Sequence, residues 1–288
     1  MNRDPAIERS RLRWGRLDAG GVAGLLLTLL VVGAAIFAPY LMAHDPTLQD
    51  LEVRLLPPAW AGGRWDYPLG TDPLGRDLYS RIVLGARASL VVGLLSVGAA
   101  VMVGVPLGLI TGFYRGRLDR VVMRIADIQL AFPEVLLALA ILAVLGPSNV
   151  NLVIVLALSR WVVFARVVRG ETLAVRERDY VLAASAMGAG DLRTIARHVV
   201  PNILNGVIIL ASVTLTRVII AESSLSFLGF GIQPPTPTWG GMISDGRGYL
   251  ATAWWVSTLP GFALMLAVMG INLLGDAVRD LLDPRLRV

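Results

Sequence analysis

Six stretches of the chain are apolar and long enough to cross a membrane. A transmembrane helix needs about 20 predominantly apolar residues. The stretches cover about residues 19–42, 86–113, 121–145, 150–168, 201–221 and 253–274. Two long polar segments, rich in Pro, Gly and Trp, follow the first and fifth stretches. We therefore expect an all-α integral membrane protein with six transmembrane helices.

The overall composition agrees with a membrane location. The 288 residues are 55% hydrophobic and 16% charged, and the mean hydropathy is +0.67. Soluble domains carry about 45–50% apolar and about 25% charged residues. The first stretch is longer than the apolar region of a signal peptide, which has about 7–15 residues, and it lacks a clear cleavage site. We therefore expect it to be retained as a helix.

The positions of the basic residues predict the orientation. All 26 are Arg. With the N-terminus in the cytoplasm, eighteen of them lie on the cytoplasmic side, six lie outside, and Arg160 and Arg217 fall within spans. Cytoplasmic loops of membrane proteins carry such an excess of positive charge. We expect both termini to be cytoplasmic, and the pI near 10.2 then reflects topology and not nucleic-acid binding.

Missing residue types limit the chemistry of the chain. There is no Cys and no Lys, and the two His residues, His44 and His198, are far apart in the sequence. A P-loop ATPase needs a Lys at the nucleotide phosphates, and Schiff-base enzymes need a Lys nucleophile. We therefore expect no catalytic residue, metal site or cofactor in this chain.

The loop between the fourth and fifth stretches, residues 176–198, predicts two short amphipathic helices. Tyr180, Ala183, Ala184 and Met187 fall at i, i+3, i+4 and i+7 and share one face of the first helix. The small Ala side chains allow another surface to approach closely. This face either packs against the protein's own bundle or docks a cytoplasmic partner, and the pattern alone leaves both open.

A glycine elbow separates these two helices. Gly188 is expected to end the first, because glycine is favoured just after a helix C-terminus. Asp191 is expected to be the N-cap of the second, with Arg193 on its polar face. Pro201 is then expected to open the fifth span.

This loop resembles the EAA motif of ABC importer permeases. Ala183, Ala184, Gly188 and Pro201 stand at the spacing of that motif, whereas Leu182 stands where the family usually has Glu. In the family, the loop forms coupling helices that sit in a groove of the ATPase subunit. The resemblance therefore implies ATPase coupling by the residues Tyr180, Ala183, Ala184, Met187, Gly188, Asp191, Arg193 and Pro201.

Three further segments resemble permeases of dipeptide, oligopeptide and nickel ABC importers, and specifically the C-type partner of these heterodimers. They read LGTDPLGRD at 69–77, SFLGFGIQPPTPTWGGM at 226–242 and NLLGD at 272–276. The resemblance implies the type I ABC importer permease fold in a bacterial inner membrane. It divides the chain into an N-terminal part (1–85), a five-helix core (86–276) and a cytoplasmic tail (277–288).

The resemblance also implies partners and a mechanism. The partners are a homologous second permease, two cytoplasmic ATPases that hold ATP and Mg, and an extracytoplasmic solute-binding protein. Transport proceeds by alternating access, and this subunit is not itself an enzyme. Di- or oligopeptides are the expected substrates, with nickel or another small solute as the alternative. An ATP-independent carrier or channel is a rival of another class, disfavoured by the coupling-like loop and by the lack of an internal repeat.

Charged residues in and near the spans are the remaining candidates. Charges in a bilayer are costly and mark functional sites by default. We expect Arg160 to face the translocation path or a neighbouring carboxylate, and Arg217 to reach the headgroups. Glu134 and Glu222 are candidates for the same path. Asp127 is expected to pair locally with Arg124, three residues earlier in the chain.

Four residues of the two long outer segments are candidates for contact with the binding protein: Arg76, Asp77, Gln233 and Trp239. For Arg76 and Asp77, turn formation and local ion pairing are the favoured interpretation. For Trp239, the favoured role is an anchor at the membrane interface, where Trp is common.

Overall fold

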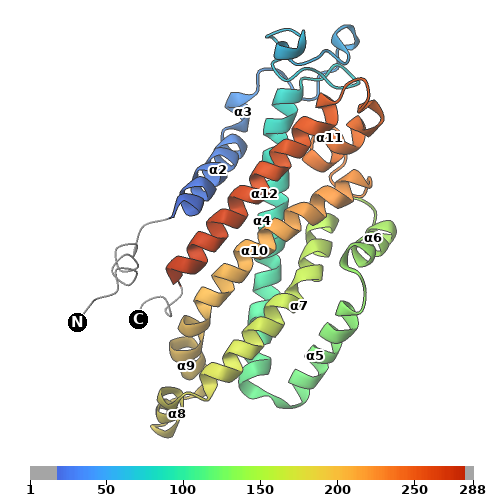
Figure 1. Ribbon diagram of the computed structural model, residues 1–288. Coiled ribbons are helices and arrows are strands. Elements are labelled where there is room, and N and C mark those ends of the chain that lie inside the picture. The colour runs from blue at the N-terminus through green and yellow to red at the C-terminus, as the bar shows by residue number, and fades with distance from the viewer. Residues whose placement is uncertain (1–17, 283–288) are drawn as a thin grey trace, which may run out of the picture.

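The computed structural model describes residues 18–282 as a helical bundle, with no strand in this range apart from one isolated bridge between Thr71 and Asp77. Five helices are long and apolar enough to cross a membrane, and Figure 1 shows them as one elongated bundle. They are α2 (Ala19–Ile36), α4 (Leu78–Tyr114), α7 (Asn149–Arg176), the helix Asp191–Phe227 that contains α10 (Val200–Phe227), and α12 (Trp255–Leu282). The all-α membrane architecture is thus confirmed.

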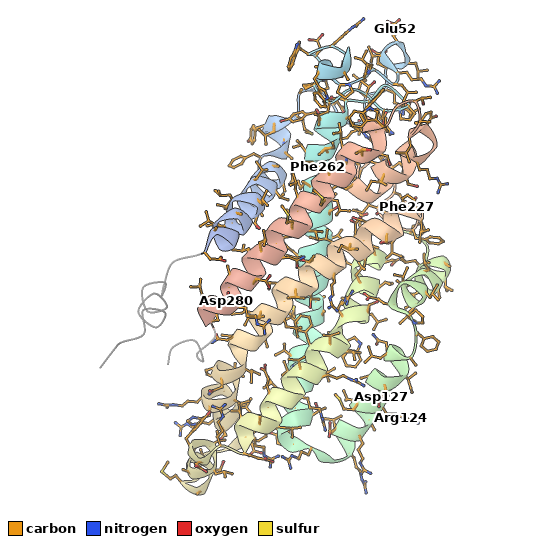
Figure 2. All side chains as sticks on the ribbon, in the orientation of Figure 1. Glu52, Arg124, Asp127, Phe227, Phe262 and Asp280 are labelled. Atoms are coloured by element: carbon orange, nitrogen blue, oxygen red, sulfur yellow. The ribbon has the colours of Figure 1, made fainter. Side chains whose placement is uncertain are left out.

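Short elements cover the two ends of the bundle (Figure 1). At the end called here the α11 end lie the segment 42–77 and α11 (Trp239–Gly246). At the opposite end, the α8 end, lie α8 (Asp179–Ala186) and α9 (Asp191–Thr194). In Figure 2, Glu52 marks the α11 end and Asp280 lies near the far end of α12. The remaining short helices are α3 (Ala38–Leu41), the 3-10 turns Leu51–Val53, Ala59–Ala61 and Arg247–Tyr249, and the π-turn Ile195–Val199.

The third apolar stretch is broken instead of kinked. It forms α5 (Gly116–Leu130) and α6 (Glu134–Leu145), whose axes differ by 91°. Pro133, which lies between them, has no N–H to donate and disfavours helical geometry at the residue before it. The described residues therefore contain five continuous membrane-length helices, and six spans only if α5 and α6 are counted together.

The second span begins eight residues before the predicted position, at Leu78. Asp77 caps the helix, because its carboxylate accepts the backbone N–H of Ser80 at 3.0 Å. The first turn contains Ser80 and Arg81, and both are buried by the segment 42–77. Hydropathy excluded this turn because it is polar, whereas tertiary packing and a cap stabilise it. The last span likewise runs to Leu282, beyond the predicted boundary at 276.

The closest helix pair, α4 and α7, packs through three glycines spaced four residues apart. A Cβ atom on Gly104 would lie 2.5 Å from the carbonyl oxygen of Trp161, and one on Gly108 would lie 2.6 Å from that of Ala165. Gly112 stands in the same relation to Arg169. Small residues at this spacing let membrane helices approach closely. The repeat is visible in the sequence, but its role became clear only from the packing.

Candidate functional site

The elbow after α8 is a Schellman motif. Gly188 has a φ of +85°, its N–H donates to Ser185 O at 3.0 Å, and the next N–H, of Ala189, donates to Ala184 O at 3.1 Å. These are the two bonds that close a helix whose following residue is left-handed. The expected glycine stop at Gly188 is therefore present.

The second half of the loop differs from the prediction at Asp191 and Pro201. Gly190 occupies the N-cap position, and Asp191 is the first helical residue, with no side-chain cap hydrogen bond. The helix that starts there passes through a π-turn and continues as α10, so Pro201 lies inside a continuous span and does not open it. Proline has no N–H for the usual helical bond, and the wider π-turn just before Pro201 accommodates this gap.

One face of α8 holds the loop to the bundle. Val181 is 1% exposed and packs with residues of α4, α7 and α10, and Ala184 is buried beside it. Arg176, at the end of α7, donates to the carbonyl of Phe113, and its guanidinium lies 5.2 Å from that ring. The predicted stripe therefore divides. Ala184 faces the protein's own bundle, whereas Tyr180, Ala183 and Met187 face outward.

The outward face of the loop is apolar. Met187 is 83% exposed, Leu192 79%, Leu182 54% and Tyr180 42%. These four residues are called the loop surface below. The α8 end extends beyond the described bundle (Figure 1), and contiguous exposed apolar side chains mark interaction sites. Leu182, which departs from the EAA motif, belongs to this surface.

Within the bundle, Arg160 of α7 pairs with Glu134, the first residue of α6. Arg160 Nη2 lies 2.6 Å from Glu134 Oε1, and the two side chains are 10% and 32% exposed. Of the two expected environments for Arg160, the structure shows the neighbouring carboxylate. The pair joins α6 to α7 next to the break at Pro133.

Glu222 does not line an open path. Its side chain is fully buried, and its carboxylate accepts hydrogen bonds from Ser89 of α4 at 3.0 Å and from Ser226 at 2.7 Å. It therefore connects α4 to α10 inside the protein. The sequence pattern could not show this, because the partner Ser89 is 133 positions away.

Two further carboxylates of α5 bind Arg residues of α7. Asp127 pairs with Arg166, so the expected local pair with Arg124 is wrong. Figure 2 shows Arg124 and Asp127 on α5. Asp119 receives two hydrogen bonds from Arg169, one of them at 2.7 Å. Neither pair was found from the sequence, because the partners are 39 and 50 residues apart.

At the α11 end, Asp72 is the centre of a buried ion network. It accepts Arg76 Nε at 2.5 Å and lies 3.5 Å from Arg81 Nε, and both Arg residues also lie within 4 Å of Asp245 of α11. Burial raises the pKa of Asp245, while Arg81 and Arg76 act to lower it. Arg76 and Asp77 are only 9% and 2% exposed, so their side chains hold this end together and present little surface to a binding protein.

Trp239 is not an anchor at the membrane interface. It is 1% exposed, and its indole N–H donates to Ile82 O of α4 at 3.1 Å. Its ring lies against Gly85, where a Cβ atom would come within 3.2 Å. Trp239 therefore fastens α11 onto α4. Gln233, in contrast, is exposed in the loop that precedes α11.

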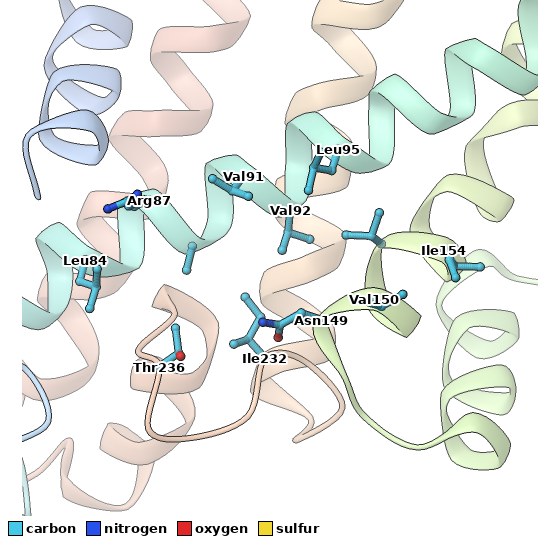
Figure 3. Close-up of a pocket in the computed structure, with 12 residues that line it drawn as sticks. Leu84, Arg87, Val91, Val92, Leu95, Asn149, Val150, Ile154, Ile232 and Thr236 are labelled. Carbon is cyan, nitrogen blue, oxygen red and sulfur yellow. The ribbon is translucent and has the colours of Figure 1, made fainter.

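A groove of about 420 Å³ lies near the α11 end (Figure 3). Figure 3 shows it between α4, the start of α7 and the loop that carries Ile232 and Thr236. Its lining is mostly aliphatic, and Arg87, Asn149 and Thr236 are the polar residues in it. Because a peptide needs donors and acceptors for its amide groups, we do not place a substrate site in this groove.

Membrane-length helices joined by an exposed apolar loop, with paired charges inside the bundle, define a transport permease and not an enzyme. Comparison with known proteins agrees. The family described as "Binding-protein-dependent transport system inner membrane component" matches residues 104–288, and the "N-terminal TM domain of oligopeptide transport permease C" matches residues 18–58. The chain belongs to this family of ABC transporter permease subunits, whose ATPase is a separate chain.

Named relatives resemble the chain over most of its length. The di/tripeptide transport system permease protein DppC of Pseudomonas aeruginosa is 45% identical over 94% of this chain and 89% of that protein. The probable D,D-dipeptide transport system permease protein DdpC of Escherichia coli is 40% identical over 92% and 87%. The glutathione transport system permease protein GsiD of Pectobacterium atrosepticum is 41% identical over 92% and 87%.

A solved structure confirms the fold. An inward-facing conformation of the MetNI methionine ABC transporter superposes with a TM-score of 0.58. It covers 70% of this chain and 97% of its own, at 22% sequence identity. The type I ABC importer permease fold is thus confirmed.

Proposed function

We propose that this chain is one of two permease subunits of an ATP-driven importer of di- and oligopeptides. The relatives named for peptide and glutathione transport support this substrate class. The α8 end faces the cytoplasm in this proposal, in agreement with the excess of Arg on that side. Two cytoplasmic ATPases, a second permease and an extracytoplasmic binding protein complete the importer.

The observation that carries the proposal is the loop surface. Its four large apolar side chains stand on a helix fixed from behind by Val181 and by the contact between Arg176 and Phe113. A rigidly held surface of this kind passes a movement of the ATPase to α7 and α10, between which it lies. Closure of the ATPases on ATP would therefore tilt these spans and open the path outward.

At the α11 end, we propose that exposed groups receive the binding protein. Gln233 remains the candidate there, because it is exposed and its amide is held by the carbonyl oxygens of Gly229 and Gly231 at 3.1 and 2.9 Å. Arg76, Asp77 and Trp239 support this end from inside.

The test is recovery of the complex from native membranes. The tagged chain is solubilised in mild detergent, and the co-purifying proteins are identified by mass spectrometry. We expect ABC ATPases and a second permease, and ATP-dependent uptake of labelled tripeptides after reconstitution with the binding protein. A chain that purifies alone, or a complex that takes up no peptide, contradicts the proposal.

A double variant tests the loop surface directly. Met187→Glu with Leu192→Glu places two charges on the apolar face, and we expect at least a tenfold loss of recovered ATPase, since hot-spot residues contribute about 2 kcal/mol or more. The matched control is Trp65→Glu, which charges an apolar side chain that is 81% exposed at the α11 end. The control should retain the ATPase. Equal recovery from both variants would place the docking site elsewhere.

A further inference from the structure

Two Arg residues lie at the same depth in the bundle. Arg160 is eleven residues from the start of α7, and Arg217 is ten residues from the end of α10. Both of these helix ends are at the α11 end. At 1.5 Å per residue, each Arg is about 15–16 Å along its helix, close to the middle of a hydrocarbon core about 30 Å thick.

The protein neutralises only one of these two positive charges. Glu134 pairs with Arg160 at 2.6 Å, whereas Arg217 has no carboxylate within 4 Å among residues 18–282. Helix α10 contacts both α6 and α7, and the charge of Arg217 acts on Glu134 and on Arg160. The three side chains therefore form one cluster with a net charge of +1.

Two observations show that the cluster has donors to spare. Arg217 is exposed on the surface of the bundle. Arg160 is 8% exposed, and its Nε finds no hydrogen-bond acceptor among the described residues. Snorkelling to the headgroups suits Arg residues near helix ends, but Arg217 is at mid-span. It must therefore face another protein surface or a water-filled path, and the expectation that it reaches the headgroups is wrong.

We propose that Arg217, together with Arg160, binds the carboxylate of the peptide as it passes through the membrane. Guanidinium groups suit carboxylates because they offer two parallel N–H donors. Glu134 orients Arg160 and offsets one charge, which keeps binding weak enough for release. The inference rests on the proposed peptide substrate and names the groups that recognise it.

The test measures uptake of three tripeptides by the reconstituted importer: Ala-Ala-Ala, Ala-Glu-Ala and Ala-Lys-Ala. We expect Arg217→Gln to lower uptake of Ala-Glu-Ala about tenfold, which corresponds to loss of one charge-assisted hydrogen bond. Uptake of Ala-Lys-Ala should fall least, because its side chain is repelled by the cluster. Arg217→Lys should keep the order of the three peptides, since it keeps the charge.

The matched control is Arg87→Gln, which removes another exposed Arg of a membrane-length helix, one with no carboxylate within 4 Å among residues 18–282. It should transport all three peptides like the unaltered complex. Unchanged uptake by Arg217→Gln, or an equal loss for all three peptides, overturns the inference. Absence of peptide uptake by the unaltered complex is seen before any substitution, and it overturns the proposed function and peptide as the occupant.

Discussion

Single residues in this protein act mainly through how closely they let helices approach. Gly108 illustrates this, because the carbonyl oxygen of Ala165 occupies the space that a side chain would need. Gly98 lies on the same helix, yet a Cβ atom there would meet nothing within 4 Å. The same residue type on one helix therefore has opposite packing requirements. Identity alone does not distinguish these positions, whereas the neighbouring helix does.

This contrast predicts opposite effects of two Ala substitutions. We expect Gly108→Ala to destabilise the protein by about 1–3 kcal/mol, because an added methyl group overpacks the contact between α4 and α7. Gly98→Ala should be neutral or stabilising by up to about 1 kcal/mol, since Ala favours the helix. Thermal unfolding of the two purified variants in detergent measures the difference. Equal melting temperatures would contradict the packing argument.

Among the elements, the cap at the α11 end depends on one carboxylate. Asp72 accepts the backbone N–H groups of Leu74 and Arg76 at 2.8 and 3.0 Å, and it also faces two buried Arg side chains. The segment 42–77 is thereby joined to α4, and α11 approaches the same Arg residues through Asp245. The motif at 69–77 thus has a structural explanation, in accord with the favoured interpretation of Arg76 and Asp77.

Removing the charge of Asp72 should loosen this end. Asp72→Asn keeps an oxygen for the backbone N–H groups but leaves Arg76 and Arg81 without their closest carboxylate. Breaking a buried ion pair costs about 3–5 kcal/mol, and proteolysis within the segment 42–77 should accelerate accordingly. Asp66→Asn, at an exposed position of the same segment, is the control and should be cleaved like the unaltered protein. Identical cleavage of both variants would show that the network does not hold the segment.

At the scale of the whole molecule, the protein is a bundle with two different ends. One end is closed by the segment 42–77 and α11, and the other carries the loop surface. The ion cluster of Arg160, Glu134 and Arg217 lies between them at mid-depth. This arrangement matches the proposed importer, in which substrate arrives at one end and ATPases act at the other.

The proposed orientation is directly testable, because the chain contains no Cys. A single Cys introduced at Trp65 should react with a membrane-impermeant maleimide added to intact spheroplasts. A single Cys at Met187 should react only after the membrane is permeabilised. Both side chains are highly exposed, at 81% and 83%, so a difference in labelling reports sidedness and not burial. The reverse pattern would invert the topology.

The sequence by itself determined the class of the protein and the approximate position of its spans. Apolar stretches of this length have no stable location other than a membrane, and the glycine stop at Gly188 is a local property of the backbone. The EAA-like loop and the motif at 69–77 are also short segments that a linear pattern records. These features were therefore visible before any contact was known.

Tertiary structure alone decided which charged groups meet. Glu222 bonds to Ser89, Asp127 to Arg166, and Trp239 to α4, across 133, 39 and 157 positions of the chain. It also decided that α5 and α6 are separate helices, and that Arg217 remains as the surplus charge beside Arg160 and Glu134. The physical reason is that hydropathy and helical periodicity describe one helix at a time. The pairing of charges inside a bundle depends on how several helices cross in space.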